Sequence, residues 1–213
     1  MKVAYLAESP ADQAALTILT EAILKQKTEP TTYAGLRHRG WPSVKAVLPV
    51  VLKELHYHTD TEGFVFIVDS NGDQPHLLSH EPPNEPESKC RLCQLRRITD
   101  EVLSKIRPRP AGPSLKVAIG LAVPAIEAWL LCGEDPHVTE AAWINGLKET
   151  RRGLMPFTKK GLKRQLYGTS HPSLELETEA MQRAATRLAA DLSCLERLFP
   201  FGFGTLLKRL RSW

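Results

Sequence analysis

Two short apolar runs in the first seventy residues end directly in a carboxylate, and this pattern constrains the fold more than any other feature of the chain. Residues 3–7 precede Glu8, and residues 63–68 precede Asp69. Short apolar runs bounded by turn residues, the second also rich in β-branched and aromatic side chains, are typical of buried parallel strands. We therefore predict strands that deliver acidic side chains to the ends of a parallel sheet.

Helical and strand patterns alternate through residues 1–133. Helical stripes precede Lys27 and follow Gly40, where Pro49 predicts a kink or a later helix start. Further strands are predicted at residues 31–36 and 115–122, and a further helix at residues 89–106. This alternation predicts an α/β fold with a largely parallel central sheet flanked by helices.

The domain organisation follows from the same patterns. Residues 1–133 are predicted to form the α/β core, with an insertion near residues 74–88 that is polar and rich in proline. Loops of this length are often functional. Residues 134–213 carry helical patterns near 139–147, 160–167, 175–192 and 203–211, and we expect them to form a C-terminal helical cap packed on the core.

The composition bounds the partners and the compartment. The 213 residues carry a formal net charge of +4, which is compatible with a polyanionic partner such as nucleic acid. The chain has no apolar run of about 20 residues, so we expect no membrane partner. The N-terminus does not resemble a secretory signal, and a cytoplasmic location with reduced cysteines is expected. The chain also lacks a Walker-type phosphate loop and a serine-hydrolase nucleophile motif.

Three acidic residues each follow a predicted strand: Glu8, Asp69 and, after a short turn, Glu127. Ligand sites in open α/β sheets gather beyond the carboxyl ends of the strands, so these side chains should meet at one edge. Clustered carboxylates repel one another unless a cation neutralises them. Since Mg²⁺ and similar hard cations prefer carboxylate oxygens, the pattern predicts a divalent metal site.

Several acidic residues at or near these strand ends also have a purely structural interpretation. Asp12 can serve only as a helix N-cap. The segment Asp69-Ser70-Asn71-Gly72-Asp73 is rich in turn-forming residues. Glu127 is expected in the first turn of a helix, where the macrodipole favours a carboxylate. Their joint placement at strand ends is what favours the metal site.

The same motifs resemble the Toprim fold, as it occurs in OLD-type nucleases and in Toprim-like families associated with bacterial phage defence. A strand ends in Glu8 with Asp12 close behind, and a later strand ends in Asp69 with Asn71 and Asp73 following. A further strand leads to a helix with Glu127 beside an aromatic residue. Residues 159–163 and 199–203 resemble the ending of these families, so the resemblance covers most of the chain.

The resemblance implies a magnesium- or manganese-dependent hydrolase, an endonuclease of DNA or RNA in antiviral defence, working with a separate ABC-type ATPase subunit. Catalytic roles would fall to Glu8 as general base or metal ligand, to Asp69, and to Lys163 as a stabiliser of the phosphoryl transition state, although Lys163 can also be a solvated helix residue. The implied metal ligands are Glu8, Asp12, Asp69, Asn71, Asp73 and Glu127. Asn71 stands where the family has a second aspartate, which leaves open a catalytically degenerate binding or regulatory subunit of the ATPase.

Basic residues gather in the C-terminal part, where Lys159, Lys160 and Arg164 are candidates for nucleic-acid contacts or for an ordinary solvated helix face. A second metal site is also possible by residue type. His76, His80, Cys90 and Cys93 have pair spacings that suit structural zinc. Without zinc, Cys93 would be a partly buried thiol on a helix and the histidines loop residues.

Overall fold

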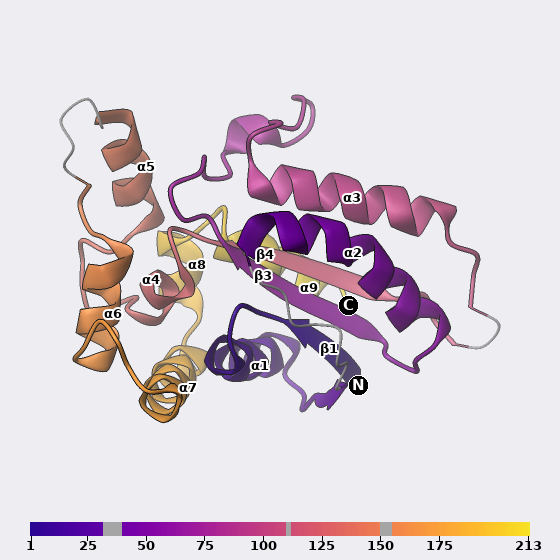
Figure 1. Ribbon diagram of the computed structural model, residues 1–213, viewed down its shortest axis with the longest axis horizontal. Helices are drawn as coiled ribbons and strands as arrows, with labels where there is room; N and C mark the ends of the chain where they lie inside the picture. Colours follow the sequence, from indigo (N-terminus) through magenta and orange to yellow (C-terminus); the bar gives the residue numbers. More distant parts are fainter. Residues whose placement is uncertain (32–39, 110–111, 150–154) are drawn as a thin grey trace.

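Parallel strands form the centre of the protein. The computed structural model describes residues 1–31, 40–109, 112–149 and 155–213. Its described residues form a four-stranded, all-parallel sheet in the order β2-β1-β3-β4 (Figure 1). The strands are β1 (Lys2–Leu6), β2 (Glu29–Thr31), β3 (Gly63–Asp69) and β4 (Lys116–Ala122). The predicted α/β class is therefore confirmed.

The strand predictions hold best in the middle of the sheet. β3 is buried along its whole length, since it lies between β1 and β4 and both of its faces are covered. β2 begins at Glu29, two residues before the predicted start. The rest of the strand predicted at residues 31–36 lies outside the described residues.

Alternate side chains of the strands enter two different hydrophobic clusters. Phe64 and Phe66 of β3 belong to one cluster, which helices α2 (Gly40–Tyr57) and α3 (Arg91–Lys105) cover. Val65 and Ile67 belong to the other, which contains α1 (Pro10–Leu24), α7 (Leu174–Ala190) and α9 (Phe203–Arg211). The period of two along β3 thus separates the layers above and below the sheet (Figure 1).

Helix α2 continues through Pro49, so the prediction of a later helix start is wrong. A proline within a helix removes one backbone hydrogen bond and crowds the preceding turn. Leu48, Val51 and Leu52, which flank Pro49, are each no more than 1% exposed. Their burial against the sheet stabilises a helix that local sequence alone would interrupt.

The C-terminal helices build the core as well as cap it. Helices α4 (Ile126–Leu130), α5 (Glu140–Glu149) and α6 (Lys159–Tyr167) gather at the end of the sheet where β3 and β4 finish (Figure 1). Further on, α7 packs against α1, and α9 packs on β4 after the short helix α8 (Ser193–Leu198). Helices α7 and α9 therefore fill one face of the sheet, whereas Trp143 of α5 joins the cluster on the other face.

One close approach fixes the entry into α9. The buried Glu140 accepts hydrogen bonds from the backbone N–H groups of Phe201 and Gly202, at 2.8 and 2.9 Å. A Cβ atom on Gly202 would lie 2.2 Å from the carbonyl oxygen of Leu121, so only glycine fits against β4 there. Burial raises the pKa of the Glu140 carboxyl to about 7. Glu140 therefore serves the fold.

The insertion contains little regular structure. Within residues 74–88, the single regular element described is a short 3-10 turn, η2 (Leu78–His80). Among the described helices, none combines the length and the apolar character that crossing a membrane requires.

Candidate functional site

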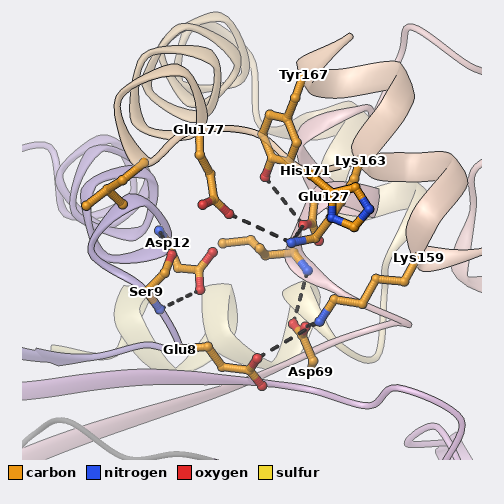
Figure 2. A network of polar contacts seen from close by, with 12 residues as sticks. Glu8, Ser9, Asp12, Asp69, Glu127, Lys159, Lys163, Tyr167, His171 and Glu177 are labelled. Atoms are coloured by element: carbon orange, nitrogen blue, oxygen red, sulfur yellow. Dashed lines mark hydrogen bonds and ion pairs between the residues drawn. The ribbon is translucent and has the colours of Figure 1, made fainter. Parts of the chain in front are cut away.

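Four acidic residues converge where β1 and β3 end (Figure 2). Asp69 is the last residue of β3, and Glu8 follows β1 by two positions. Asp12 lies in the first turn of α1, and Glu127 in the first turn of α4. Parallel topology brings these elements to one edge although they are up to 119 residues apart in sequence.

Helix α6 supplies the positive charges of this site. Lys159, Lys163 and Tyr167 are spaced four residues apart, so they lie on one face of the helix. The Nζ atom of Lys159 forms an ion pair with Oδ2 of Asp69 and lies 3.9 Å from Oε2 of Glu8. Glu8 and Asp69 therefore share one ammonium group, which shows that both carboxylates face the same space.

A second group of contacts surrounds Glu127. Nζ of Lys163 lies 3.6 Å from Oε1 of Glu127 and 4.0 Å from Oε1 of Glu177, which α7 contributes. The hydroxyl of Tyr167 donates to the same Oε1 of Glu127 at 3.4 Å. The other oxygen of Glu127, Oε2, is buried and has no hydrogen-bond partner among the described residues. A buried carboxylate oxygen without a partner is costly, and a cation would satisfy it.

Burial and mutual repulsion raise the pKa values of the buried acids. The pKa of Asp12 rises to about 7, first because the carboxyl is buried and then because Asp69 and Glu127 are near. Burial also raises the pKa of Asp69 to about 7, although Lys159 opposes the shift. Carboxylates outnumber ammonium groups at this edge, so the site favours an additional positive charge.

The N-terminus of α1 differs from the prediction for Asp12. Ser9, not Asp12, is the N-cap, and the Ser9 hydroxyl accepts from the Asp12 N–H at 3.1 Å. Asp12 is the third helical residue, and its Oδ2 accepts from the Ser9 N–H at 2.9 Å. This capping box fixes one oxygen of Asp12 while its raised pKa shows that the carboxyl also senses the acidic cluster.

Asn71 and Asp73 follow Asp69 in a tight turn, and their hydrogen bonds are to residues outside the acidic cluster. Asn71 has a left-handed backbone with φ of 52°, and its N–H donates to the carbonyl of Pro124 at 2.8 Å. The carboxylate of Asp73 accepts from Nε of Arg91 at 2.5 Å and its side chain is 48% exposed. Both residues thus fit the turn interpretation, and a metal role for them stays a prediction.

Asp69 itself is fixed from three directions. Its Oδ1 accepts from the N–H of Ile126 at 3.2 Å, at the start of α4, while Oδ2 faces Lys159. Its carbonyl oxygen accepts from Nη1 of Arg91 at 2.6 Å. Asp69 therefore joins the end of β3 to α3, α4 and α6.

The three predicted nucleic-acid contacts are placed differently from one another. Lys159 points into the acidic cluster, whereas Lys160 and Arg164 are exposed on the outside of α6. Lys163 also points into the cluster, where its Nζ lies 3.6 Å from Oε1 of Glu127, although 28% of its side chain remains exposed. The difference arises because positions four apart on a helix share a face and adjacent positions do not.

Two site residues, Tyr167 and Glu177, were not anticipated from the sequence. The spacing of Tyr167 at four residues from Lys163 is a signal that could have found it. Glu177 lies in the first turn of α7, where a carboxylate is favoured for purely local reasons. Only the packing of α7 against α1 brings it to the site, so the sequence held no usable signal for Glu177.

A second cluster with metal-binding side chains lies in the insertion and at the start of α3. His76, His80, Cys90 and Cys93 are all buried, and each offers a ligand atom within 4.8 Å of the others. The cluster could hold a metal ion such as zinc. The sequence prediction of a possible zinc site therefore corresponds to a formed group of side chains.

The protein was also compared with known proteins. A scan against protein-family models, a search of curated proteins and a search of solved structures all find no match for this chain.

Proposed function

We propose that the protein is a divalent-metal-dependent phosphodiesterase of the Toprim type, and that it acts as a nuclease on DNA or RNA in antiviral defence. One observation carries the proposal: Glu8 and Asp69 contact the same ammonium group at the carboxyl edge of a parallel sheet, beside the buried Glu127. This gathering of carboxylates with the ammonium groups of Lys159 and Lys163 around one space supports the proposal (Figure 2).

The residues present fit Mg²⁺ or Mn²⁺. Asp69 and Glu127 offer buried carboxylate oxygens, and Oε2 of Glu127 lacks any other partner among the described side chains. Asp12 adds a nearby carboxyl whose pKa, at about 7, would fall once a cation is close. A hard cation prefers such oxygen donors, and it leaves positions for water and for phosphate oxygens.

The side chains can divide the chemistry of phosphodiester hydrolysis among them. The bound metal would lower the pKa of the attacking water and neutralise charge on the scissile phosphate. Glu8, whose side chain is 41% exposed, would accept the proton of that water. Lys163 can stabilise charge on the phosphoryl group, and Tyr167 orients Glu127 through its hydroxyl.

The test is cleavage of labelled DNA and RNA by purified protein with Mg²⁺ or Mn²⁺. Asp69→Asn and Glu8→Gln are expected to lower the rate by about 100-fold or more, as loss of a group that stabilises the transition state does. Asp100→Asn, which changes an exposed carboxylate on α3, is the matched control and should cleave as the wild type does. Equal rates for all four proteins would exclude this site.

One contact favours a second candidate function. Lys159 already pairs with Asp69, so the protein itself supplies part of the neutralising charge that a metal would bring. The alternative is therefore a catalytically degenerate Toprim-type subunit that binds nucleic acid or regulates an ABC-type ATPase. It predicts no metal-dependent cleavage, together with co-purification of the intact protein with a partner. The proposed nuclease is expected to use a separate ATPase as well, so cleavage is the result that separates the two.

A further inference from the structure

The cluster in the insertion differs from an accidental gathering of polar residues. His76 is fully buried, and its Nδ1 atom lies 3.5 Å from the sulfur of Cys90 and 3.5 Å from that of Cys93. Tetrahedral zinc with ordinary bond lengths separates its sulfur and nitrogen ligands by about 3.3–3.8 Å. These two nitrogen–sulfur distances therefore already match those of a zinc site.

The geometry points to a structural zinc site formed by His76, His80, Cys90 and Cys93, which ties the insertion to α3 and thereby holds the turn that carries Asp69. Two thiolates and two neutral imidazoles balance the charge of one Zn²⁺ and leave no position open for water. Binding requires only that the two thiols release their protons to solvent. This site is separate from the carboxylate cluster, and it does not depend on the proposed nuclease activity.

Polar contacts that hold the His76 ring support the assignment. The Nε2 atom of His76 lies 2.8 Å from Oε1 of Glu81, which also accepts from Nη1 of Arg96 at 2.7 Å. A histidine that ligates metal through one ring nitrogen usually donates the other N–H to a carboxylate. The carboxylate fixes the tautomer that leaves Nδ1 free for the metal. Arg96 in turn balances the charge of Glu81.

The insertion needs such a link because it has few other means of staying ordered. Its single described regular element is η2, and Leu78 within it is 71% exposed. Segments that bury little apolar surface cannot offset the entropy of ordering their backbone. A closed zinc site supplies that stabilisation directly.

A zinc ion at this site would also influence the position of the acidic cluster, through Arg91. Cys90 is the N-cap of α3, and the next residue, Arg91, donates to the Asp69 carbonyl and to the Asp73 carboxylate. The guanidinium also lies over the ring of Trp41, at 4.9 Å from its centroid. Zinc at Cys90 and Cys93 fixes the start of α3, and with it the position from which Arg91 holds the turn after β3.

The first experiment measures metal in the purified full chain. We expect about one zinc per chain in the wild type, and loss of it in Cys90→Ser/Cys93→Ser. Cys194→Ser is the matched control, since Cys194 lies beside Cys132 and outside the cluster, and it should keep its zinc. Wild-type protein without zinc after supplementation, or equal zinc in the double variant, would overturn the site.

A second measurement covers the case in which the double variant does not fold. Wild-type protein stripped of metal is titrated with Co²⁺, which should give the visible and thiolate charge-transfer bands of a tetrahedral sulfur and nitrogen site. Glu81→Gln keeps all four ligands and should still give these bands, with metal affinity about 10–100-fold weaker. Absence of thiolate bands, or unchanged affinity in Glu81→Gln, counts against the assigned coordination.

The link to Asp69 has its own readout. Removing zinc should increase backbone hydrogen exchange both in residues 74–90 and in residues 69–73, while residues 63–67 of β3 stay protected. If zinc removal opens the insertion and leaves the exchange of residues 69–73 unchanged, the site does not hold that turn. Neither result bears on cleavage activity, so this inference and the proposed function can fail separately.

Discussion

The acidic cluster at the sheet edge and the histidine and cysteine cluster beside α3 both bring metal-binding side chains close together, but they differ in ligand type and in charge. At the sheet edge, hard carboxylate oxygens are partly neutralised by the protein's own lysines. At the insertion and the start of α3, softer sulfur and imidazole groups face one another, and within the described part of the chain neither thiol hydrogen-bonds to a lysine or an arginine. Ligand type therefore separates the sheet edge, where we propose Mg²⁺, from the histidine and cysteine group, where we infer Zn²⁺.

The difference also concerns access. All four residues of the histidine and cysteine cluster are buried, as expected for a structural site. At the sheet edge the Glu8 side chain is 41% exposed and that of Lys159 36% exposed, so a substrate can reach them. A substrate would meet one cluster, whereas the other would act only through the fold.

The largest expected effect comes from removing zinc. A zinc-selective chelator should lower the melting temperature by roughly 10 °C or more, because loss of a structural metal costs several kcal/mol and each kcal/mol is worth about 2–4 °C in a chain of this size. Differential scanning fluorimetry measures this. Zn²⁺ should restore the melting temperature and excess Mg²⁺ should not. If Mg²⁺ fully restored the melting temperature, the two clusters would not differ in metal preference.

The next effect concerns the lysine that pairs with Asp69. Lys159→Met leaves a buried carboxylate without its cation, and we expect a loss of about 1–2 kcal/mol at pH 8 after allowing for the partial exposure of Lys159. Mg²⁺ should stabilise this variant more than the wild type, because the ammonium group no longer competes for Asp69. Denaturant unfolding with and without Mg²⁺ measures both.

The exposed neighbour provides the control for that experiment. Lys160→Met removes the same charge from the adjacent position of α6, where the side chain is exposed, and should change neither stability nor the Mg²⁺ response. If Mg²⁺ stabilises Lys159→Met and wild type equally, Lys159 does not occupy space that a cation would use.

A smaller effect is expected from pH. Asp12 and Asp69 have pKa values near 7 in the folded protein, well above the ordinary 3.8, so folding retains their protons. The contribution of these two protonated groups to the free energy of unfolding is fully present below pH 4 and is lost as the pH rises toward 7. Without Mg²⁺, Asp12→Asn should therefore gain at least about 1 kcal/mol over wild type at pH 8, with an upper limit of about 4 kcal/mol set by the full shift, and almost nothing at pH 4.

Urea unfolding at the two pH values measures the difference, with Asp100→Asn as the exposed control. Asparagine keeps an oxygen that can accept from the Ser9 N–H, so the capping contact is retained. A gain of equal size at both pH values would show that the carboxyl of Asp12 does not titrate as its burial implies.

The acidic edge could be predicted from the sequence because it depends on topology alone. A strand followed by a carboxylate places that carboxylate at the end of a parallel sheet, so Glu8 and Asp69 meet whatever the loops do between them. The roles of Lys163 and Tyr167 depend on where α6 packs. That position follows from tertiary contacts, and residue spacing within α6 reveals only which side chains share a face.

In the insertion, residue types were the useful signal and the sheet topology was not. Residue types and pair spacing predicted that His76, His80, Cys90 and Cys93 could form a metal-binding group, and the structure brings them together although the segment has little secondary structure. Glu81, which supports His76, has no such signature, since a carboxylate in a polar loop is usually solvated. Pro49 illustrates the general limit, because burial of α2 against the sheet overrides a local helix breaker.

The smallest expected effect comes from Asp73, and it tests whether this residue only stabilises the turn or also binds the metal. Its carboxylate pairs with Arg91 and is 48% exposed, so Asp73→Asn should change the free energy of unfolding by no more than about 0.5 kcal/mol. If Asp73 serves only this turn, calorimetric titration should give Mg²⁺ affinities within about twofold of wild type, a difference below 0.5 kcal/mol. A tenfold or larger loss would place Asp73 among the metal ligands and require the turn to rearrange when the cation binds. In that event Arg91 would have to release the carboxylate, and the zinc-held start of α3 would control how readily the acidic edge accepts its metal.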